Sequence, residues 1–337
     1  MGPTGNAYRV VQIHPTRRCN LRCRHCYSSS GPDESDMLEP TDLLHAITDA
    51  AVEGYNVVGF SGGEPLLYPA LADLLAHARQ CGMYTTVTTN GMLLTRRRLK
   101  ALREVTNLIA ISVDGIPQSH NWMRASDRAF DVMASRLPAI RDAGIPFGFI
   151  FTLTQFNLDE LDWVLEFALS QGARLLQIHP LESVGRARET LTHALPDWVE
   201  LGYAVIAVAR AQALAGDRLR VQLDVAPRDL LIAEPERVFA SEALPADAQL
   251  AEMVSPLIVE PDGFVVPVEY SFGHDYAIGN LAEARLARLA VEWKRERYPK
   301  FLDLCRSTFK EVTHCSQPPV MNWYGQVTSR GATTLSA

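Results

Sequence analysis

Short apolar runs alternate with longer amphipathic segments through most of this chain, and this rhythm constrains the fold more than any other feature. The runs are rich in β-branched residues and are typical of buried strands. Regular strand-then-helix alternation predicts a parallel sheet with right-handed crossovers. The pattern alone leaves open whether the sheet closes toward a barrel or forms a doubly wound sheet. The strand-like runs are 10–13, 57–60, 85–88, 108–113, 147–152, 175–178 and 219–223, and the helix-like stretches are 40–53, 69–81, 95–105, 130–143, 158–171 and 195–215.

The rhythm changes in the last third of the chain. Residues 257–268 contain two apolar runs around Pro261-Asp262-Gly263, which predicts a β-hairpin. A charged helix is expected over 281–297, and the final segment 327–337 resembles a tail. We therefore expect a core domain over residues 1–225 and a small α+β extension over residues 226–337.

Composition excludes several classes of protein. The net charge of −7 gives no overall attraction to nucleic acid or to an anionic membrane surface. No secretory signal is visible, and the apolar stretch around 203–215 is interrupted by Arg210 before it reaches the ~20 residues of a membrane helix. Six cysteines do not form the dense framework of a secreted disulfide scaffold. We expect a cytoplasmic protein whose clustered thiols bind metal.

Three of these cysteines lie within eight residues. Cys19, Cys23 and Cys26 have the spacing C-x3-C-x2-C in the stretch CNLRCRHCY, directly after the first strand-like run. A structural zinc site needs four ligands, and His25 is an awkward fourth because it adjoins Cys26. An iron–sulfur cubane normally takes four thiolates, so three would leave one iron free for a substrate or cofactor.

This loop resembles the cluster motif of the radical S-adenosylmethionine (radical SAM) enzymes, and the resemblance covers residues 9 to about 190. Ser61-Gly62-Gly63-Glu64-Pro65 is similar to the family's GGEP motif. The resemblance implies a partial (β/α)6 TIM-type barrel, one [4Fe-4S] cluster held by three cysteines, and bound SAM. In the family, reductive cleavage of SAM gives a 5′-deoxyadenosyl radical, which abstracts hydrogen from an unactivated carbon.

The same resemblance implies a set of residues around SAM. Gly62, Gly63 and Glu64 would contact its amino group. The structural alternative for the two glycines is that they only form a tight turn between strand and helix. His120-Asn121-Trp122-Met123-Arg124 is similar to a His-Asp-x-x-Arg segment but has Asn121 in place of the acid. Core packing explains Ile178 equally well, and Asn90 and Ser112 have structural alternatives in a turn and in backbone hydrogen bonding. The implied cofactor-binding residues are Tyr27, Gly62, Gly63, Glu64, Asn90, Ser112, Arg124 and Ile178.

Catalytic residues that act on the substrate are unknown at this point, with three candidates. His179 follows the sixth strand, just before a Gly185-Arg186-Ala187 turn that resembles one in peptide-handling and natural-product members of the family. Cys305 and Cys315 are candidate radical-quenching thiols, although burial is the commoner fate of a free cysteine.

The hairpin over 257–268 and Gly279-Asn280 resemble the start of the SPASM or twitch extension of peptide-maturing members. Val268 and Glu269 stand where that extension has its first auxiliary-cluster cysteine, and only Cys305 and Cys315 follow. Two thiolates do not hold a conventional cubane. The extension is therefore expected to keep the fold without the second cluster.

The leading hypothesis is a radical SAM enzyme that acts on a peptide or natural-product precursor. The alternative is one that acts on a sugar, nucleotide or cofactor precursor, and a non-catalytic metal-binding protein is the hypothesis from outside the enzymes. Whether the reaction is an oxidation, elimination or isomerisation is not determined. The expected partners are an electron donor such as flavodoxin or ferredoxin and the substrate, with no nucleic acid and no membrane.

Overall fold

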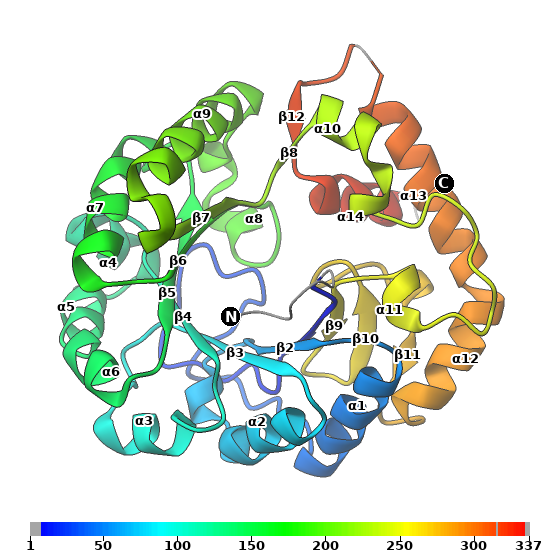
Figure 1. Cartoon of the computed structure of the whole chain (residues 1–337), viewed down its shortest axis with the longest axis horizontal. Coiled ribbons are helices and arrows are strands. Elements are labelled where there is room, and N and C mark those ends of the chain that lie inside the picture. Colours follow the sequence, from blue (N-terminus) through cyan, green and yellow to red (C-terminus); the bar gives the residue numbers. More distant parts are fainter. Residues whose placement is uncertain (1–7, 315, 334–337) are drawn as a thin grey trace.

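A single curved sheet organises the computed structural model, which describes residues 8–314 and 316–333. Seven parallel strands follow one another in chain order, and helices lie on the outer face of their curve (Figure 1). This confirms the expected partial barrel. The elements are β1 Val10–Ile13, α1 Pro40–Val52, β2 Val57–Phe60, α2 Leu71–Gln80, β3 Tyr84–Thr89, α3 Arg96–Leu102, β4 Leu108–Ser112, α4 Pro117–Arg124, α5 Ala129–Ala134, α6 Leu137–Ala143, β5 Phe147–Leu153, α7 Leu161–Gln171, β6 Leu175–Pro180, α8 Ala187–Thr190, α9 Trp198–Ala215 and β7 Arg220–Leu223.

All seven strand-like runs are strands, with ends that shift by at most two residues. The helix expected over 130–143 is instead two helices, α5 and α6, which meet at Ser135 and Arg136. Pro138 lies in the first turn of α6, where its missing N–H costs nothing, whereas the same residue inside a continuous helix would break a hydrogen bond. The short helix α4 was not expected.

The C-terminal extension continues the barrel sheet, and its strands β8 and β12 form a separate two-stranded antiparallel sheet. Strand β9 pairs in parallel with β1, and β10 and β11 add antiparallel strands beyond it, so the order within the described residues is β11-β10-β9-β1-β2-β3-β4-β5-β6-β7. The expected hairpin is confirmed as β9 and β10. The elements of the extension are β8 Ala226–Pro227, α10 Arg228–Ala233, α11 Leu250–Met253, β9 Leu257–Val259, β10 Phe264–Pro267, β11 Gly279–Asn280, α12 Leu286–Glu296, α13 Tyr298–Val312, β12 Val320–Met321 and α14 Trp323–Thr333.

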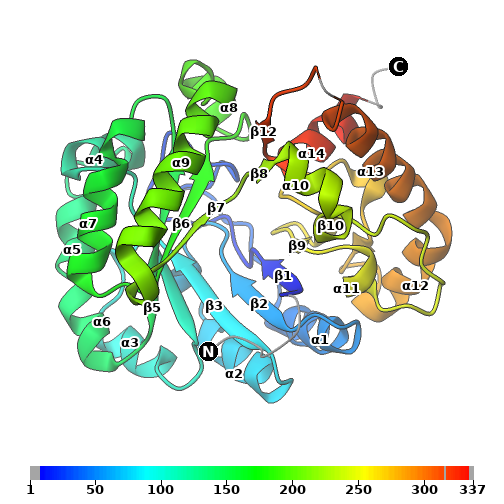
Figure 2. The same cartoon turned by 45° about the horizontal axis from the view of Figure 1, so that its top comes forward.

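Helices α12, α13 and α14 lie on the side of the molecule opposite α5 and α7 (Figure 2). The expected tail is wrong for residues 327–333, which belong to α14, while residues 334–337 lie outside the described residues. One hydrophobic core runs from Val11 in β1 to Val327 in α14. The division at residue 225 stays a prediction, but no break in the core marks it.

Helix α9 carries an exposed apolar face. With the turn that follows it, Trp198–Arg218 is long and apolar enough to span a membrane by length and composition, and it is the one such helix in the part of the chain that the structure describes. The expectation that no stretch reaches this length is wrong by that measure, because a single Arg210 does not disqualify the helix. In the structure α9 packs on β7 and α7, as a barrel helix does.

Candidate functional site

The three clustered cysteines lie together in the loop that follows β1. Cys19 and Cys23 are buried, Cys26 is partly buried, and all three are free thiols that pack with Leu21 and Met92. Parallel barrels place their active sites at this carboxyl end of the strands. The structure therefore brings the three predicted ligands together at the position where the fold expects chemistry.

Arg186 and Gly185 hold the backbone of this loop. The Arg186 guanidinium donates to the carbonyl oxygens of Cys23 at 2.6 Å and Ser30 at 2.8 Å, and its amide donates to the Cys26 carbonyl at 2.9 Å. Gly185 has a φ of +56°, and a Cβ there would lie 2.1 Å from the Tyr27 carbonyl oxygen. The Gly-Arg-Ala turn is thus a clamp on the cysteine loop, a role that the sequence did not assign.

We expect Gly185→Ala to lose most of the metal that the wild type binds, because the new methyl group pushes away the backbone of Cys26 and Tyr27. Gly144→Ala is the matched control, since Gly144 has a similar φ of +69° but open space around it. It should cost only the ~1–2 kcal/mol of a left-handed residue. Iron content per chain after anaerobic reconstitution and the unfolding free energy check both variants. Equal iron content in the two would contradict the clamp.

The GGEP turn docks against the same loop from the other side. The amides of Gly63 and Glu64 donate to the carbonyl oxygens of Thr16 at 2.8 Å and Arg18 at 2.9 Å. A Cβ on Gly63 would lie 2.2 Å from the Arg18 carbonyl oxygen. Close approach to the cysteine loop thus already requires glycine at this position, and contact with the SAM amino group stays a prediction.

The Glu64 carboxylate is completely buried and accepts hydrogen bonds from neighbouring residues of the protein. It accepts hydrogen bonds from the Thr89 hydroxyl at 2.7 Å and from the amides of Asn90 at 3.0 Å and Leu66 at 3.2 Å. Burial raises its pKa, and the three hydrogen bonds oppose that shift. Glu64 therefore fixes the end of β3 beside the turn, and any contact with a ligand would use its remaining acceptor capacity.

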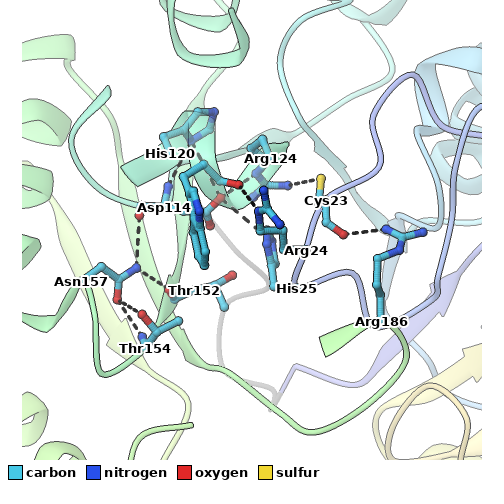
Figure 3. A network of polar contacts seen from close by, with 11 residues as sticks. Cys23, Arg24, His25, Asp114, His120, Arg124, Thr152, Thr154, Asn157 and Arg186 are labelled. Atoms are coloured by element: carbon cyan, nitrogen blue, oxygen red, sulfur yellow. Dashed lines mark hydrogen bonds and ion pairs between the residues drawn. The ribbon is translucent and has the colours of Figure 1, made fainter. Parts of the chain in front are cut away.

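A buried ionic hub supports the loop from the barrel side (Figure 3). Asp114, which follows β4, accepts from Arg124 Nε at 2.6 Å and lies 4.0 Å from His25 Nε2 and 3.8 Å from His120 Nδ1. The Nη1 atom of Arg124 reaches the Cys23 thiol at 3.8 Å. Asn157 donates to the carbonyls of Asp114 and Thr152 and so ties the ends of β4 and β5.

The charges of this hub depend on one another. Burial opposes ionisation of Asp114, but the nearby Arg124, His25 and His120 outweigh it and lower the pKa of Asp114 to about 2. Burial lowers the pKa of both His25 and His120 to about 4, so both imidazoles are neutral at pH 7. The permanent pair is thus Asp114 and Arg124. The sequence analysis assigns no role to Asp114, and the predicted contact of Arg124 with SAM stays a prediction.

The four other predicted cofactor-binding residues differ in their contacts and burial. Asn90 donates to Asn20 Oδ1 at 2.9 Å, and the Tyr27 hydroxyl lies 3.1 Å from Ser61 Oγ. Ser112 is buried at the end of β4. Ile178 has no exposed surface and belongs to the main core, which favours its packing alternative. A direct role for each of these four residues stays a prediction.

The candidate catalytic residues that the structure describes, His179 and Cys305, lie in different elements. His179 lies at the end of β6 and is partly exposed beside Asp224 and Glu182. Cys305 is 2% exposed within α13, which favours the burial alternative, and its role as a radical-quenching thiol stays a prediction. Cys315 lies outside the described residues.

The residues present fit a three-thiolate cluster. Burial, followed by the charges of Glu64 and the other two cysteines, raises the pKa of Cys19 to about 12. Such thiols become thiolates when a cation takes up their charge. The Arg124 guanidinium at Cys23 suits the anionic state of a loaded thiolate cluster. Among the described residues of the extension, Cys305 is the sole cysteine, so no ligand set for a second cubane is found there.

Comparison with known proteins identifies the barrel. Residues 13–168 match the model of the radical SAM superfamily. The chain carries a radical SAM domain. Members of this family are enzymes that use a [4Fe-4S] cluster and SAM. The recognition made from CNLRCRHCY and SGGEP is therefore confirmed at the level of the family.

Curated relatives match between about half and three quarters of this chain. The chain is 32% identical to the Fe-coproporphyrin III synthase of Methanosarcina barkeri over 188 residues, which is 55% of this chain and 47% of that protein. It is 29% identical to the PqqA peptide cyclase of Ruegeria pomeroyi over 260 residues, 75% of this chain and 65% of the relative. The chain thus spans about half the length of the first curated relatives it matches.

Solved structures match nearly the whole fold. Streptococcus suis SuiB bound to S-adenosylmethionine superposes with a TM-score of 0.68 at 15% identity, covering 92% of this chain and 75% of SuiB. Native anSMEcpe with bound AdoMet gives 0.64 at 17% identity and covers 96% of both chains. At these identities the likeness establishes the fold, including the extension.

Proposed function

We propose that this chain is a radical SAM enzyme that modifies a peptide precursor. The observation that carries the substrate class is the match to the PqqA peptide cyclase, which runs over 260 residues and so is too long to be confined to the barrel. The sporulation killing factor maturation protein SkfB of Bacillus subtilis supports the same class at 27% identity over 207 residues. A thiol-based site of this kind requires a reducing compartment, so the proposal places the protein in the cytoplasm.

In this proposal, Cys19, Cys23 and Cys26 would hold a [4Fe-4S] cluster and leave one iron without a protein ligand. When bound and reduced, the cluster supplies the electron that cleaves SAM to methionine and a hydrogen-abstracting 5′-deoxyadenosyl radical. The chain's own residues do the positioning. Arg186 fixes the carbonyls of the cysteine loop, and the buried pair of Asp114 and Arg124 sets a positive charge beside Cys23. Leu21 and Met92 pack against the cysteines and exclude water from them.

A second candidate substrate class is a tetrapyrrole or another small metabolite. The specific observation is the 32% identity to Fe-coproporphyrin III synthase, with a 29% identical AdoMet-dependent heme synthase beside it. Both of these matches cover only 188 residues, 55% of this chain. They extend over less of this chain than the match to the PqqA peptide cyclase does.

Anaerobic reconstitution with iron and sulfide, followed by incubation with SAM and a strong reductant, should give 5′-deoxyadenosine. An acidic one-electron carrier of the flavodoxin or ferredoxin type should replace the chemical reductant. The substrate is then sought with two deuterated probes, a short peptide chosen from any short reading frame beside the gene, and iron coproporphyrin III. Transfer of deuterium into 5′-deoxyadenosine from the peptide supports the proposal, and transfer from the porphyrin alone supports the second candidate. A reconstituted protein that leaves SAM intact contradicts both.

A further inference from the structure

Three side chains that can bind a metal ion meet at the turn of the C-terminal hairpin. Glu260 directly follows β9, Asp262 lies in the turn before β10, and His274 begins the one-turn helix His274–Tyr276. One ligand atom from each side chain lies within 4.8 Å of the other two. An imidazole and two carboxylates form a donor set that proteins use for divalent ions.

The separation of His274 from Glu260 fits two ligands of one ion better than a hydrogen bond. His274 Nε2 lies 3.5 Å from Glu260 Oε2, beyond the ~2.7–3.2 Å of an ordinary N–H···O hydrogen bond. Two atoms that each lie ~2.1 Å from a tetrahedral ion are ~3.4 Å apart. These two side chains are therefore at ligand spacing, and Asp262 needs only a small movement to join them.

Glu260 is a buried carboxylate without a permanent cation beside it. Its side chain is 6% exposed, and in the part of the chain that the structure describes no Lys or Arg pairs with Glu260 or Asp262. The Ser271 amide donates to Oε1, whereas Oε2 has only His274 opposite it. Burial raises the pKa of Glu260, the Ser271 amide opposes this shift, and the charge of Asp262 adds to it. Buried charges are normally paired or bound to a metal, and a cation at Oε2 would offset both burial and repulsion.

Neighbouring residues hold the three side chains in place. The ring of His274 stacks on the ring of Phe264, with centroids 3.8 Å apart and planes 19° from parallel. The Phe264 amide donates to Asp262 Oδ1 at 3.2 Å, and Asn280 donates to the Asp262 carbonyl at 3.2 Å. Ligands that are fixed before binding lose less conformational freedom when the ion arrives.

The cluster lies at the same edge of the sheet as the cysteine loop. Strand β9 runs parallel to β1, so Glu260 and the cysteine loop follow the carboxyl ends of neighbouring strands. Ser271, whose amide binds Glu260, comes directly after Tyr270. The Tyr270 ring lies 5.4 Å from the ring of Tyr27 in the cysteine loop. The cluster therefore connects the hairpin turn to a segment that packs against that loop.

We propose that Glu260, Asp262 and His274 bind one divalent transition-metal ion, such as Zn²⁺ or Mn²⁺, with water completing its coordination. Carboxylates suit Mn²⁺ and imidazole suits Zn²⁺, whereas Mg²⁺ and Ca²⁺ take oxygen ligands. The ion joins the hairpin turn to residues 268–276 and holds Tyr270 beside the cysteine loop. This site is separate from the three cysteines, and its occupation does not depend on the radical chemistry proposed above.

The site is tested on the cofactor-free full chain with Mn²⁺ as the probe, because carboxylates suit Mn²⁺ and thiolates do not. The electron paramagnetic resonance signal of free Mn²⁺ gives the bound fraction. The wild type should bind one Mn²⁺ per chain, and Glu260→Gln and His274→Ala should each weaken binding at least ~10-fold. The His274 side chain is 48% exposed, so its removal should not disturb the core.

Two control variants should keep wild-type affinity for Mn²⁺. His193 is also exposed, and its ring also contacts a phenylalanine, Phe156, so His193→Ala matches the loss of His274. Cys19→Ala tests whether the cysteine loop contributes to binding. Loss of Mn²⁺ binding in Cys19→Ala would assign the ion to that loop and overturn the proposal.

Thermal unfolding separates loss of the ion from loss of the fold. Glu260→Gln removes a buried charge that has no Lys or Arg partner, so its metal-free unfolding midpoint should equal or exceed that of the wild type. Mn²⁺ at a hundredfold excess over its dissociation constant should raise the wild-type midpoint by ~5 °C and leave that of Glu260→Gln unchanged. Bound Mn²⁺ should also slow amide hydrogen exchange over residues 268–276 in the wild type and not in His274→Ala.

A wild type that binds no Mn²⁺, or a Glu260→Gln or His274→Ala variant with wild-type affinity, overturns the site. Bound Mn²⁺ that leaves hydrogen exchange over residues 268–276 unchanged overturns the joining role. None of these measurements uses SAM or an iron–sulfur cluster. Their failure therefore leaves the proposed function standing, and a failure to form 5′-deoxyadenosine leaves the metal site standing.

Discussion

Replacing Cys19, Cys23 or Cys26 by alanine should remove nearly all iron from the reconstituted protein. With three ligands in place the wild type should bind about four iron atoms and four sulfides per chain, which is the content of one cubane. Loss of one thiolate leaves two, and two do not hold a conventional cubane. Iron and sulfide analysis and the visible absorption of the brown cluster measure the effect, and 5′-deoxyadenosine formation should fall with them.

Cys81→Ala is the matched control for these variants. Cys81 is a free and partly buried cysteine at the end of α2, where its thiol contacts His77 at 3.7 Å. Its removal should leave the iron content unchanged. An alanine variant of Cys19, Cys23 or Cys26 with the iron content of the wild type would contradict the cluster assignment, and so would a wild-type protein that binds a single zinc ion through these cysteines.

Asp114→Ala should cost about 3–5 kcal/mol of unfolding free energy, because it leaves the Arg124 guanidinium buried without its partner. Denaturant unfolding of the cofactor-free protein measures the loss. Asp142→Ala is the control, since Asp142 pairs with Arg96 at 3.3 Å on the surface, where a pair contributes ~0–1 kcal/mol. Equal losses in the two variants would show that the Asp114 pair does not stabilise the fold.

The pH dependence of this loss has a definite sign. The pKa of Asp114 is about 2 in the folded protein and ~3.9 in an unfolded chain. The pair therefore stabilises the fold fully above pH ~4, and its contribution falls as the pH drops toward 2. The difference in unfolding free energy between the wild type and Asp114→Ala should become smaller as the pH falls over that interval. A difference that stays constant would place its origin in packing instead of charge.

The barrel and the cysteine ligands were predictable because their signals are local. Strands such as 10–13 and 57–60 are short β-branched runs, and three cysteines in eight residues need no knowledge of distant contacts. Helix α14 was not predicted, since its sequence WYGQVTSRGAT contains two glycines and two threonines, which are weak helix formers. Its packing against α13 decides the structure there.

The supporting residues of the site were harder to predict because they depend on long-range contacts. Asp114 gains its role from Arg124 and His25, which reach it from different loops. The predicted contact of Glu64 with the SAM amino group stays a prediction, but the hydrogen bonds that it accepts from Thr89, Asn90 and Leu66 follow from contacts that no local pattern shows. The hydrogen bond from Arg186 to the Cys23 carbonyl joins residues 163 positions apart, and no local pattern predicts it.

The pairing of β9 with β1 has a consequence for synthesis of the chain on the ribosome. Val11 pairs with Leu257, so the second neighbour of the first strand is absent until synthesis has passed residue 257. Until then the nascent barrel exposes an apolar edge strand, the kind of edge that recruits other chains. Contacts of such long sequence separation also slow folding. The extension therefore covers the exposed edge of β1 late in synthesis. A protein shortened before residue 257 should be prone to aggregate even though its cysteine loop is intact.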